Sequence, residues 1–313
     1  MKILLPSSVP LAPSLPQDVS AVVYDAAAPV PEEHLDAEAL VVWGNRREDL
    51  VAVAGRMPNL RWVQTLAAGP DAVLSAGFAP GVVVTSGVGL HDATVTEHAL
   101  ALTLALLRRL PQAAAAQAQH RWADEIGGIQ PLRPDGAVTS LIGARVLVWG
   151  FGNIGRNLAP LLRGLGAEVR GVARTAGRRN GFDVVAEGDL NAELARTDVL
   201  IMILPATPQT ERALDADRLA ALPPHAFVVN VGRGSTVDED ALADALTSGG
   251  IAGAAVDVTA VEPLPADSDL WDLPNLLITP HAAGGRPVGA DELVAENLAA
   301  LRAGEQLRNV VAP

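Results

Sequence analysis

Three polar residues in the second half of the chain could together bind and protonate a small acid. Arg233, Glu262 and His281 each stand just past a short apolar run of the kind that forms a strand. An arginine guanidinium can bind a carboxylate through two parallel hydrogen bonds and polarise a neighbouring carbonyl group. A carboxylate beside an imidazole orients the ring and favours its protonated form, which can donate a proton. The set therefore suits the reduction of a 2-oxo acid, in which the proton comes from the side away from the hydride.

Each of the three residues also has a purely structural interpretation. Arg233 lies in a Gly-Arg-Gly turn that could be solvated, Glu262 precedes a proline and could begin a loop, and a lone histidine is more often structural than catalytic. Parallel strands, however, bring the residues at their carboxyl ends to one edge of the sheet. Three suitable side chains at three such ends favour the catalytic interpretation.

The other histidines are not expected to act in catalysis. One lies on an expected long helix, one beside a tryptophan and three in turn-like contexts: His98, His120, His34, His91 and His225. Because no His-x-x-x-His pair or carboxylate cluster has the spacing of metal ligands, we expect no catalytic metal.

A glycine-rich stretch has the spacing of a dinucleotide-binding loop. Gly150, Gly152 and Gly155 form the pattern G-x-G-x-x-G, with Asn153 and Ile154 between the last two glycines. The pattern alone is weak in a chain with 29 glycines. An apolar strand pattern runs into the first glycine and a helix pattern follows, so free N–H groups at the helix N-terminus would attract a pyrophosphate. We therefore expect a dinucleotide-binding loop rather than a plain turn.

The residues after the second strand of this expected domain indicate the choice of cofactor. An acidic residue there accepts hydrogen bonds from a ribose hydroxyl and repels a phosphate. This chain has Ala173-Arg174-Thr175 instead, because Glu168 lies at the start of the strand and Asp183 lies too far along. With Arg178 and Arg179 this turn forms a basic cluster suited to a 2′-phosphate, so NADPH is expected over NADH. The alternative is a solvated arginine loop.

The order of apolar runs and helix patterns predicts two sheets. Short apolar runs alternate with helix patterns along the chain, which favours parallel sheets covered by helices. The expected strands of the first series lie at 3–5, 21–24, 40–43, 60–64 and 82–85, and those of the second at 146–149, 169–172, 199–204, 227–230, 254–258 and 276–278. Six strands with intervening helices match a dinucleotide-binding doubly wound sheet.

Two helices suggest how the domains are divided. A long helix is expected from about residue 95 to 109, capped by Thr94, and a last helix at 289–303 has no following strand, so it would return to the first domain. The expected fold class is α/β, with two doubly wound parallel-sheet domains and a crevice between them. These are a flavodoxin-like substrate domain at residues 1–94 and 287–313 and a Rossmann nucleotide-binding domain at residues 95–286.

Composition excludes several classes of protein. The 313 residues carry 36 acidic and 23 basic side chains, a formal charge of −13, which has the wrong sign for a nucleic-acid partner. The absence of cysteine removes disulfides, thiolate nucleophiles and zinc fingers, and Lys2 as the sole lysine leaves none for a Schiff base. Because no apolar run is long enough to cross a membrane, we expect a cytoplasmic protein with no membrane partner.

The chain also carries an ordered series of longer motifs. They are Ala68-Gly69-Pro70-Asp71, Val95-Thr96-Glu97-His98, Asn230-Val231-Gly232-Arg233-Gly234, Val237-Asp238, Asp257-Val258, Glu262-Pro263-Leu264-Pro265, Leu270-Trp271 and Thr279-Pro280-His281. With these motifs the chain resembles the D-2-hydroxyacid dehydrogenases over nearly its whole length. Within that family, Trp43 and the arginine-rich turn look most like the NADPH-dependent glyoxylate/hydroxypyruvate reductases.

The resemblance implies a role for each matching residue. Arg233, Glu262 and His281 match the family's catalytic residues, which would reduce a small 2-oxo acid to the D-2-hydroxy acid with hydride from NADPH and a proton from His281. It implies cofactor contacts at Gly150, Gly152, Asn153, Ile154, Gly155, Arg174, Thr175, Arg178, Pro205, Thr207, Val231 and Asp257, and substrate contacts at Trp43, Ala68, Gly69, Arg233 and His281. Pro70 departs from the family pattern and removes one N–H group near the substrate carboxylate.

Several related functions remain as alternatives. Formate dehydrogenases replace the glutamate partner of the histidine and phosphite dehydrogenases add a lysine, so Glu262 and the single lysine argue against both. The regulatory C-terminal domain that phosphoglycerate dehydrogenases often carry is not expected, since no residues follow 313. A nucleotide-sensing co-repressor of the same family could keep the catalytic residues, and a scaffold that only binds nucleotide is also open.

Residues 111–140 are expected to contact a second copy of the chain. The segment is too long and irregular for an ordinary connection, and small side chains at 113–116 permit close helix approach. Ile126, Ile129 and Leu132 would otherwise leave apolar surface in water. The family commonly forms homodimers through its nucleotide-binding domains. An active-site lid, or a loop folded onto its own domain, is the alternative.

Overall fold

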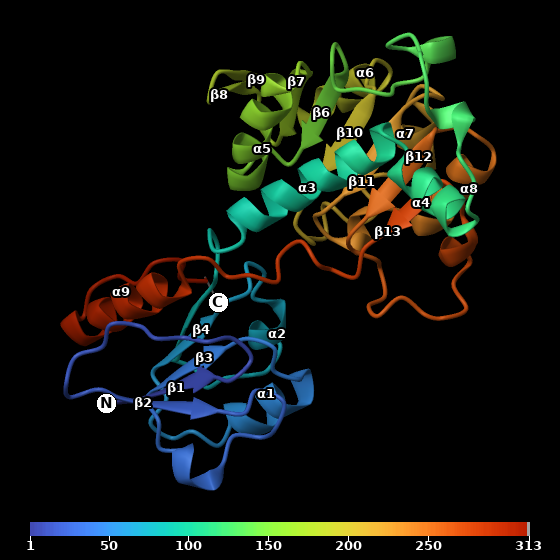
Figure 1. Cartoon of the computed structure of the whole chain (residues 1–313). Helices are drawn as coiled ribbons and strands as arrows, with labels where there is room; N and C mark the ends of the chain where they lie inside the picture. The colour runs from blue at the N-terminus through green and yellow to red at the C-terminus, as the bar shows by residue number, and fades with distance from the viewer. Residues whose placement is uncertain (312–313) are drawn as a thin grey trace. The chain divides into compact units, whose positions relative to one another are not determined.

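The computed structural model describes residues 1–311 and shows two compact units, each built around one sheet (Figure 1). The first unit holds residues 1–91 and the described chain from residue 286 onwards, and the second unit holds residues 92–285. The chain thus leaves the first unit at 91/92 and returns at 285/286, against 94/95 and 286/287 expected from the sequence. Both units are of the α/β class with mainly parallel strands, as the sequence predicts.

The first unit has a five-stranded sheet within the described residues. Its strands are β1 (Lys2–Pro6), β2 (Ser20–Tyr24), β3 (Ala39–Val42), β4 (Trp62–Thr65) and β5 (Val83–Thr85). Their order is β2-β1-β3-β4-β5 and every pairing is parallel. This is the strand order of flavodoxin-like sheets.

Helices cover both faces of this sheet, which explains why its central strand, β3, is apolar throughout. Helices α1 (Arg47–Ala54) and α2 (Asp71–Leu74) lie on one face, where Leu50 belongs to the same buried cluster as Leu4. Helix α9 (Ala290–Ala303) covers the other face, and its Val294 belongs to the cluster that contains Ile3. A short 3₁₀ turn, η1 (Glu32–His34), precedes β3.

The second unit has an eight-stranded sheet within residues 92–285. Its strands are β6 (Arg145–Trp149), β7 (Glu168–Ala173), β8 (Gly177–Arg179), β9 (Phe182–Ala186), β10 (Val199–Met202), β11 (Phe227–Asn230), β12 (Gly253–Val256) and β13 (Leu276–Ile278). The order is β13-β12-β11-β10-β6-β7-β9-β8, parallel except for the pairing of β8 with β9. It contains the doubly wound order of a dinucleotide-binding sheet.

The prediction of six strands in this sheet was wrong, because it missed the hairpin of β8 and β9. Both strands are short, and the arginines of β8 lie in what the sequence predicts to be a basic turn. A signal was nevertheless present in Asn180-Gly181, since both residues have positive φ, 50° and 79°. Asn-Gly is the preferred pair for a two-residue hairpin turn.

Helices cover both faces of the second sheet as well (Figure 1). Helices α3 (Asp92–Leu107) and α5 (Asn153–Gly164) pack on the face that buries Val146 and Val148. Helices α6 (Leu190–Leu194), α7 (Ala216–Ala220) and α8 (Glu239–Thr247) pack on the face that buries Leu147 and Trp149. Helix α3 begins at Asp92, so Thr94 lies inside its first turn, and the prediction that Thr94 caps this helix was wrong.

A less regular region connects α3 to β6. Helix α4 (Leu110–Ala118) follows α3 directly, and two 3₁₀ turns come next, η2 (Asp124–Ile126) and η3 (Pro134–Gly136). Further 3₁₀ turns are η4 (Glu187–Asp189), η5 (Gly234–Thr236) and η6 (Asp269–Asp272). The irregularity expected for residues 111–140 is therefore present, after one helix.

Candidate functional site

The glycine-rich loop lies between β6 and α5, and each glycine answers a different requirement. Gly150 has a φ of +103°, and a Cβ there would lie 2.4 Å from the Ile203 carbonyl oxygen. A Cβ on Gly155 would lie 2.9 Å from the Gly150 carbonyl oxygen, so this glycine lets the helix approach the strand. A Cβ on Gly152 would meet nothing within 4 Å. Gly152 is therefore the glycine that leaves space above the loop, which a pyrophosphate can fill.

Helix α5 begins directly under that space. Gly152 is its N-cap residue and, among the described residues, no side chain caps the helix, although Arg156 donates to the Gly152 carbonyl oxygen at 3.2 Å. The first N–H groups of the helix, starting at Asn153 and Ile154, therefore remain directed at the loop. These residues fit the phosphates of a dinucleotide.

The end of β7 places the arginine cluster beside this loop. Arg179 Nη1 donates to the Phe151 carbonyl oxygen at 3.3 Å, and its Nη2 donates to the carbonyl oxygen and hydroxyl of Thr175 at 3.0 and 3.1 Å. Arg179 thus joins the glycine loop to the turn after β7. Arg174 and Arg178 are exposed on that turn and on β8. Their positions suit a phosphate on the ribose.

Three further expected cofactor contacts follow the neighbouring strands β10 and β11. Pro205 and Thr207 lie in an exposed turn, where Thr210 donates its hydroxyl to the Pro205 carbonyl oxygen at 2.6 Å. Val231 is buried and its N–H donates to the Met202 carbonyl oxygen at 3.1 Å. All three residues stand at the carboxyl edge of the parallel sheet, as the glycine loop does.

The loop that carries Arg233 packs closely against the loop that follows β12. A Cβ on Gly232 would lie 2.6 Å from Leu204 backbone atoms, and one on Gly234 would lie 1.9 Å from the Thr259 carbonyl carbon. The two glycines therefore hold Arg233 between two neighbouring strand ends. The Arg233 side chain is half-buried, and its Nη1 donates to the Gly232 carbonyl oxygen at 2.7 Å. This geometry leaves a guanidinium at the carboxyl edge of the sheet.

The structure brings His281 and Glu262 together. His281 Nδ1 lies 2.7 Å from Glu262 Oε2, and Glu262 Oε1 accepts a hydrogen bond from the Thr259 N–H at 3.1 Å. Both side chains are partly open to solvent, with 47% and 38% of their surfaces exposed. The carboxylate can accept only, so Nδ1 carries the proton of this bond and Nε2 is left for another group.

Asp257 organises the segment that carries His281. Its carboxylate is buried and accepts hydrogen bonds from the Ala282 N–H at 2.8 Å, the Ala283 N–H at 3.0 Å and the Thr279 hydroxyl at 2.6 Å. Its carbonyl oxygen accepts from the His281 N–H at 2.8 Å. These contacts give Asp257 a structural task beside the cofactor contact expected from the sequence.

His98 is a residue of this region that sequence reasoning missed. It was expected to be a packing or surface group, yet its Nε2 lies 2.9 Å from Thr279 Oγ1 and 3.1 Å from Asp257 Oδ1. The contact joins residues 181 positions apart in the chain. No local pattern could have indicated it, because it depends on how α3 crosses the sheet.

In the first unit the expected substrate loop follows β4. Ala68 is exposed and Gly69 is half-buried at the start of the turn into α2. The carbonyl oxygen of Leu66, two residues before Ala68, lies 2.8 Å from Nε2 of His91. The ring of His91 stacks on Trp43, with 5.2 Å between ring centroids. Trp43 is therefore packed within this unit on the same histidine that contacts the loop.

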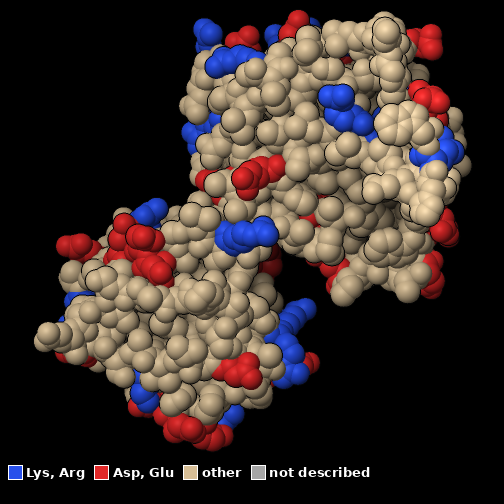
Figure 2. All heavy atoms as spheres, viewed as in Figure 1, with Lys and Arg blue, Asp and Glu red and all other residues tan. Residues whose placement is uncertain are grey.

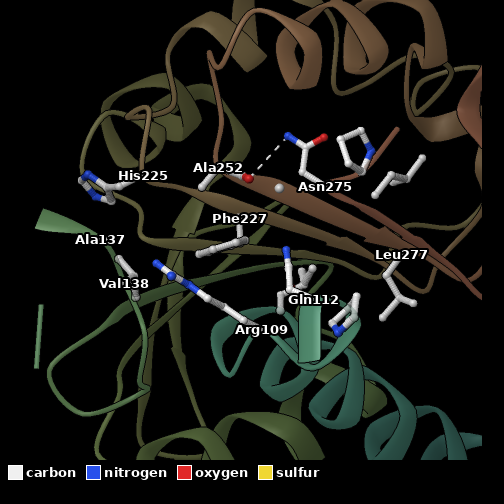
Figure 3. Close-up of a pocket in the computed structure, with 14 residues that line it drawn as sticks. Arg109, Gln112, Ala137, Val138, His225, Phe227, Ala252, Asn275 and Leu277 are labelled. Atoms are coloured by element: carbon white, nitrogen blue, oxygen red, sulfur yellow. Dashed lines mark hydrogen bonds between the residues drawn. The ribbon is translucent and has the colours of Figure 1, made fainter. Parts of the chain in front are cut away.

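In the second unit, a cavity of about 150 Å³ opens at the edge of the sheet opposite to the edge that carries the candidate catalytic residues. Figure 3 shows Arg109 and Gln112 on one side of it and Phe227 and Asn275 on the other. Phe227 is the first residue of β11, whereas the candidate catalytic residues follow strand ends. The cavity is therefore separate from the candidate site.

The surface charge, the possible metal ligands and the helix lengths of the described residues each bear on an expectation from the sequence. On the face that Figure 2 shows, Lys and Arg side chains lie singly or in small groups among acidic and uncharged residues. Within residues 1–311, no group of three or more His, Cys, Asp or Glu side chains has the geometry to hold a metal ion. No helix in that range is long and apolar enough to cross a bilayer.

Comparison with known proteins gives consistent matches. The family model of the D-isomer specific 2-hydroxyacid dehydrogenase NAD binding domain matches residues 100–283. D-3-phosphoglycerate dehydrogenase of Mycobacterium tuberculosis is 34% identical over 292 residues, which cover 91% of this chain and 52% of that protein. Glyoxylate/hydroxypyruvate reductase B of Pectobacterium carotovorum is 34% identical over 263 residues, covering 82% and 80%.

A solved structure extends the match to the whole fold. The NADPH-dependent glyoxylate/hydroxypyruvate reductase of Sinorhizobium meliloti, in complex with NADP and malonate, aligns with a TM-score of 0.75 and 32% identity, covering 99% of this chain and 96% of that one. The chain belongs to the D-isomer specific 2-hydroxyacid dehydrogenase family. The resemblance inferred from the motifs is confirmed. The chain spans about half the length of the phosphoglycerate dehydrogenases that it matches, since the match covers 52% of the Mycobacterium tuberculosis protein.

Proposed function

We propose that this protein uses NADPH to reduce a small 2-oxo acid of the glyoxylate or hydroxypyruvate type to the D-2-hydroxy acid. The observation that carries the proposal is the 2.7 Å contact between His281 Nδ1 and Glu262 Oε2. Both residues follow strand ends at the edge of the sheet where the glycine loop also lies. Relatives named as glyoxylate/hydroxypyruvate reductases support the choice of substrate class.

The residues of this chain have distinct tasks in the proposed reaction. His281 gives the proton on Nε2 to the substrate carbonyl oxygen, while Glu262 orients the ring and stabilises its positive charge. Arg233 binds the substrate carboxylate and polarises the carbonyl group. The N–H groups of Ala68 and Gly69 are proposed as a second anchor for the carboxylate. NADPH, when bound, supplies the hydride.

The preference for NADPH rests on the turn after β7. The turn offers Arg174 and Arg178 to a 2′-phosphate, and the contacts of Arg179 hold it against the glycine loop. One charged hydrogen bond contributes about 1.5 to 3 kcal/mol, which is about ten- to a hundredfold in affinity. The NADP bound to the Sinorhizobium reductase supports the same preference.

We further propose that the protein acts as a homodimer through residues 111–140. The exposed apolar side chains of this segment, Trp122 and Ile129 among them, support the proposal.

Steady-state kinetics test the proposed reaction. Glyoxylate, hydroxypyruvate, pyruvate and bulkier 2-oxo acids are each assayed with NADPH and with NADH. We expect turnover above about one per second for at least one small acid and at least about tenfold higher kcat/KM with NADPH. Equal efficiency with NADH contradicts the cofactor proposal. Tight NADPH binding without turnover of any acid favours the nucleotide-sensing alternative.

A matched pair of variants separates specific phosphate contacts from general charge. Arg178→Ser is expected to lower kcat/KM with NADPH while leaving that with NADH unchanged. Arg108→Ser removes one charge that is also exposed, beyond the end of α3, and serves as the control. Similar losses in both variants would show that the effect is nonspecific.

A further inference from the structure

Helix α3 contacts the segment that carries His281 through one side chain. His98 extends from the second turn of α3, and 22% of its side chain is exposed. Its Nε2 lies 2.9 Å from Thr279 Oγ1 and 3.1 Å from Asp257 Oδ1. Thr279 stands two residues before His281. The contact therefore reaches the base of the loop rather than the imidazole of His281.

The hydrogen-bond donors of this cluster can be assigned from its acceptors. Asp257 is buried, and its carboxylate accepts hydrogen bonds from the Thr279 hydroxyl and from two N–H groups. The Thr279 hydroxyl donates to Asp257 at 2.6 Å, so its lone pairs face His98. Nε2 of His98 therefore carries a proton and donates it toward Thr279 and Asp257. The bonds run from His98 to Thr279 and from Thr279 to Asp257.

The segment on which this chain of bonds acts is strained. His281 has a φ of +50°, which residues other than glycine rarely adopt. Its N–H donates to the Asp257 carbonyl oxygen at 2.8 Å and to the Thr279 carbonyl oxygen at 3.0 Å. The two residues that hold His281 in this conformation are thus the same two that His98 contacts. A looser Thr279 or Asp257 would let the backbone of His281 relax.

The two ends of the second unit meet at the same carboxylate. His98 belongs to α3, whose first residue, Asp92, opens the unit. Ala282 and Ala283 lie just before residue 285, where the unit closes. Asp257 accepts hydrogen bonds from this closing segment and is contacted by His98 from the opening helix. Both ends of the unit are therefore joined at Asp257, whose carbonyl oxygen also accepts the His281 N–H.

We infer that His98 is a positioning residue that holds the His281 loop in its reactive conformation through Thr279 and Asp257. The inference depends on the proposed reductase function for its catalytic consequence and on the structure alone for its conformational one. His98 does not touch the substrate in this scheme. It keeps Nε2 of His281 at a fixed place, and small displacements of a proton donor lower rates strongly.

Two measurements on His98→Leu and Thr279→Val test the inference. Hydrogen exchange of the ligand-free protein should show the N–H groups of residues 281–283 exchanging about tenfold faster in both variants. Their kcat should fall about ten- to a hundredfold. Because the two residues act in one chain of bonds, the double variant should lose no more activity than the worse single variant. Full additivity contradicts the chain of bonds.

Two further variants distinguish positioning from simple destabilisation. His98→Gln keeps an N–H donor and should retain kcat within about threefold of the unaltered protein. Ala101→Leu places leucine at an exposed position on the next turn of α3 and should change neither measurement. Equal losses in His98→Gln and His98→Leu, or faster exchange without loss of kcat, overturn the inference.

The same experiments separate this inference from the proposed function. If the unaltered protein reduces no 2-oxo acid, the proposed function fails, while the exchange rates of residues 281–283 still decide whether His98 holds the loop. If His98→Leu does not fold, Thr279→Val carries both measurements, since valine has the shape of threonine without its hydroxyl. Unchanged exchange in Thr279→Val overturns the inference.

Discussion

At the scale of single residues, the proposed chemistry depends on the imidazole of His281, which is fixed by a small number of contacts. Glu262 contacts one ring nitrogen of His281 at 2.7 Å, and the backbone of Asp257 holds the peptide N–H of His281 at 2.8 Å. The ring is thus fixed from one side and the main chain from the other. A group held in this way loses little entropy when the substrate arrives, which is what a proton donor requires.

Substitution of Glu262 should reveal that it acts only through His281. His281→Ala removes the proposed proton donor and should lower kcat by at least about a hundredfold. Glu262→Gln keeps the size of the side chain but not its charge, so the loss should be smaller, about ten- to a hundredfold. Both variants should bind NADPH normally in fluorescence titrations, because the glycine loop is unchanged. Glu262→Gln added to His281→Ala should cost nothing further, and an additional loss would assign Glu262 a separate role.

The carboxylate of Asp198 has a structural task at the edge of the second sheet that lies opposite to the edge of Glu262 and His281. It is buried and accepts hydrogen bonds from Arg145 Nη2 at 3.0 Å, Arg133 Nη2 at 3.1 Å and His225 Nε2 at 2.9 Å. Burial alone would raise the pKa of Asp198, but the hydrogen bonds from Arg145, Arg133 and His225 outweigh burial and hold that pKa well below its usual value. The ionised form is therefore favoured in the folded state.

Asp198→Asn should lower the free energy of unfolding at neutral pH by about 2 to 4 kcal/mol. Because folding lowers the pKa of Asp198, its stabilising contribution is complete above its unfolded pKa, about 3.9, and declines as the pH falls below that value. Urea unfolding at pH 7 and at pH 3 should therefore show a smaller difference between the two proteins at pH 3. Asp267→Asn, in an exposed loop, is the control. A difference that grows toward pH 3 would contradict this account.

At the scale of elements, two glycines of one loop should respond differently to the same substitution. Gly152→Ala adds a methyl group where nothing lies within 4 Å, so the ligand-free fold should lose only about 1 kcal/mol from the weaker N-cap residue. The methyl group would occupy the space proposed for the pyrophosphate, and NADPH affinity should fall at least about tenfold. Titration calorimetry and thermal unfolding measure the two effects.

Gly150→Ala supplies the contrast to that prediction. Its φ of +103° and the carbonyl oxygen 2.4 Å from the added Cβ should make this variant lose stability before any ligand is present. If Gly152→Ala bound NADPH as tightly as the unaltered protein, the cofactor would not lie over this loop.

The elements that sequence patterns predicted are those whose burial leaves a clear run or spacing of apolar residues along the chain. The parallel strands β6, β10 and β11 are buried on both faces and read as continuous apolar runs. The hairpin of β8 and β9 lies at the sheet edge and is too short and polar for such a pattern. His281 and Glu262 could be paired in advance because their strand ends are adjacent. The contact of His98 could not, since it joins a helix to a loop 181 positions away.

At the scale of the whole molecule, the irregular region after α4 presents apolar side chains that its own unit does not cover. Trp122 is 87% exposed and Ile129 is fully exposed, while Leu132 and Ile142 are about half exposed. Arg133 nevertheless fixes the segment to the sheet through Asp198, so the apolar groups are presented from an anchored segment. The cavity lined by Arg109 and Gln112 opens beside its start. An anchored segment with exposed tryptophan and isoleucine favours an interface over a lid.

The paired substitution Trp122→Ser and Ile129→Ser should therefore convert a dimer into a monomer without unfolding it. Both side chains are exposed within the single chain, so their loss removes little buried surface from the monomer, whereas apolar and aromatic groups at the centre of an interface carry much of its affinity. Light scattering at micromolar concentration should give twice 32.3 kDa for the unaltered protein and 32.3 kDa for the variant. Val23→Ser, 65% exposed on β2, is the control and should remain dimeric. A monomeric unaltered protein contradicts the dimer, and a dimer that tolerates both substitutions places its interface away from this segment.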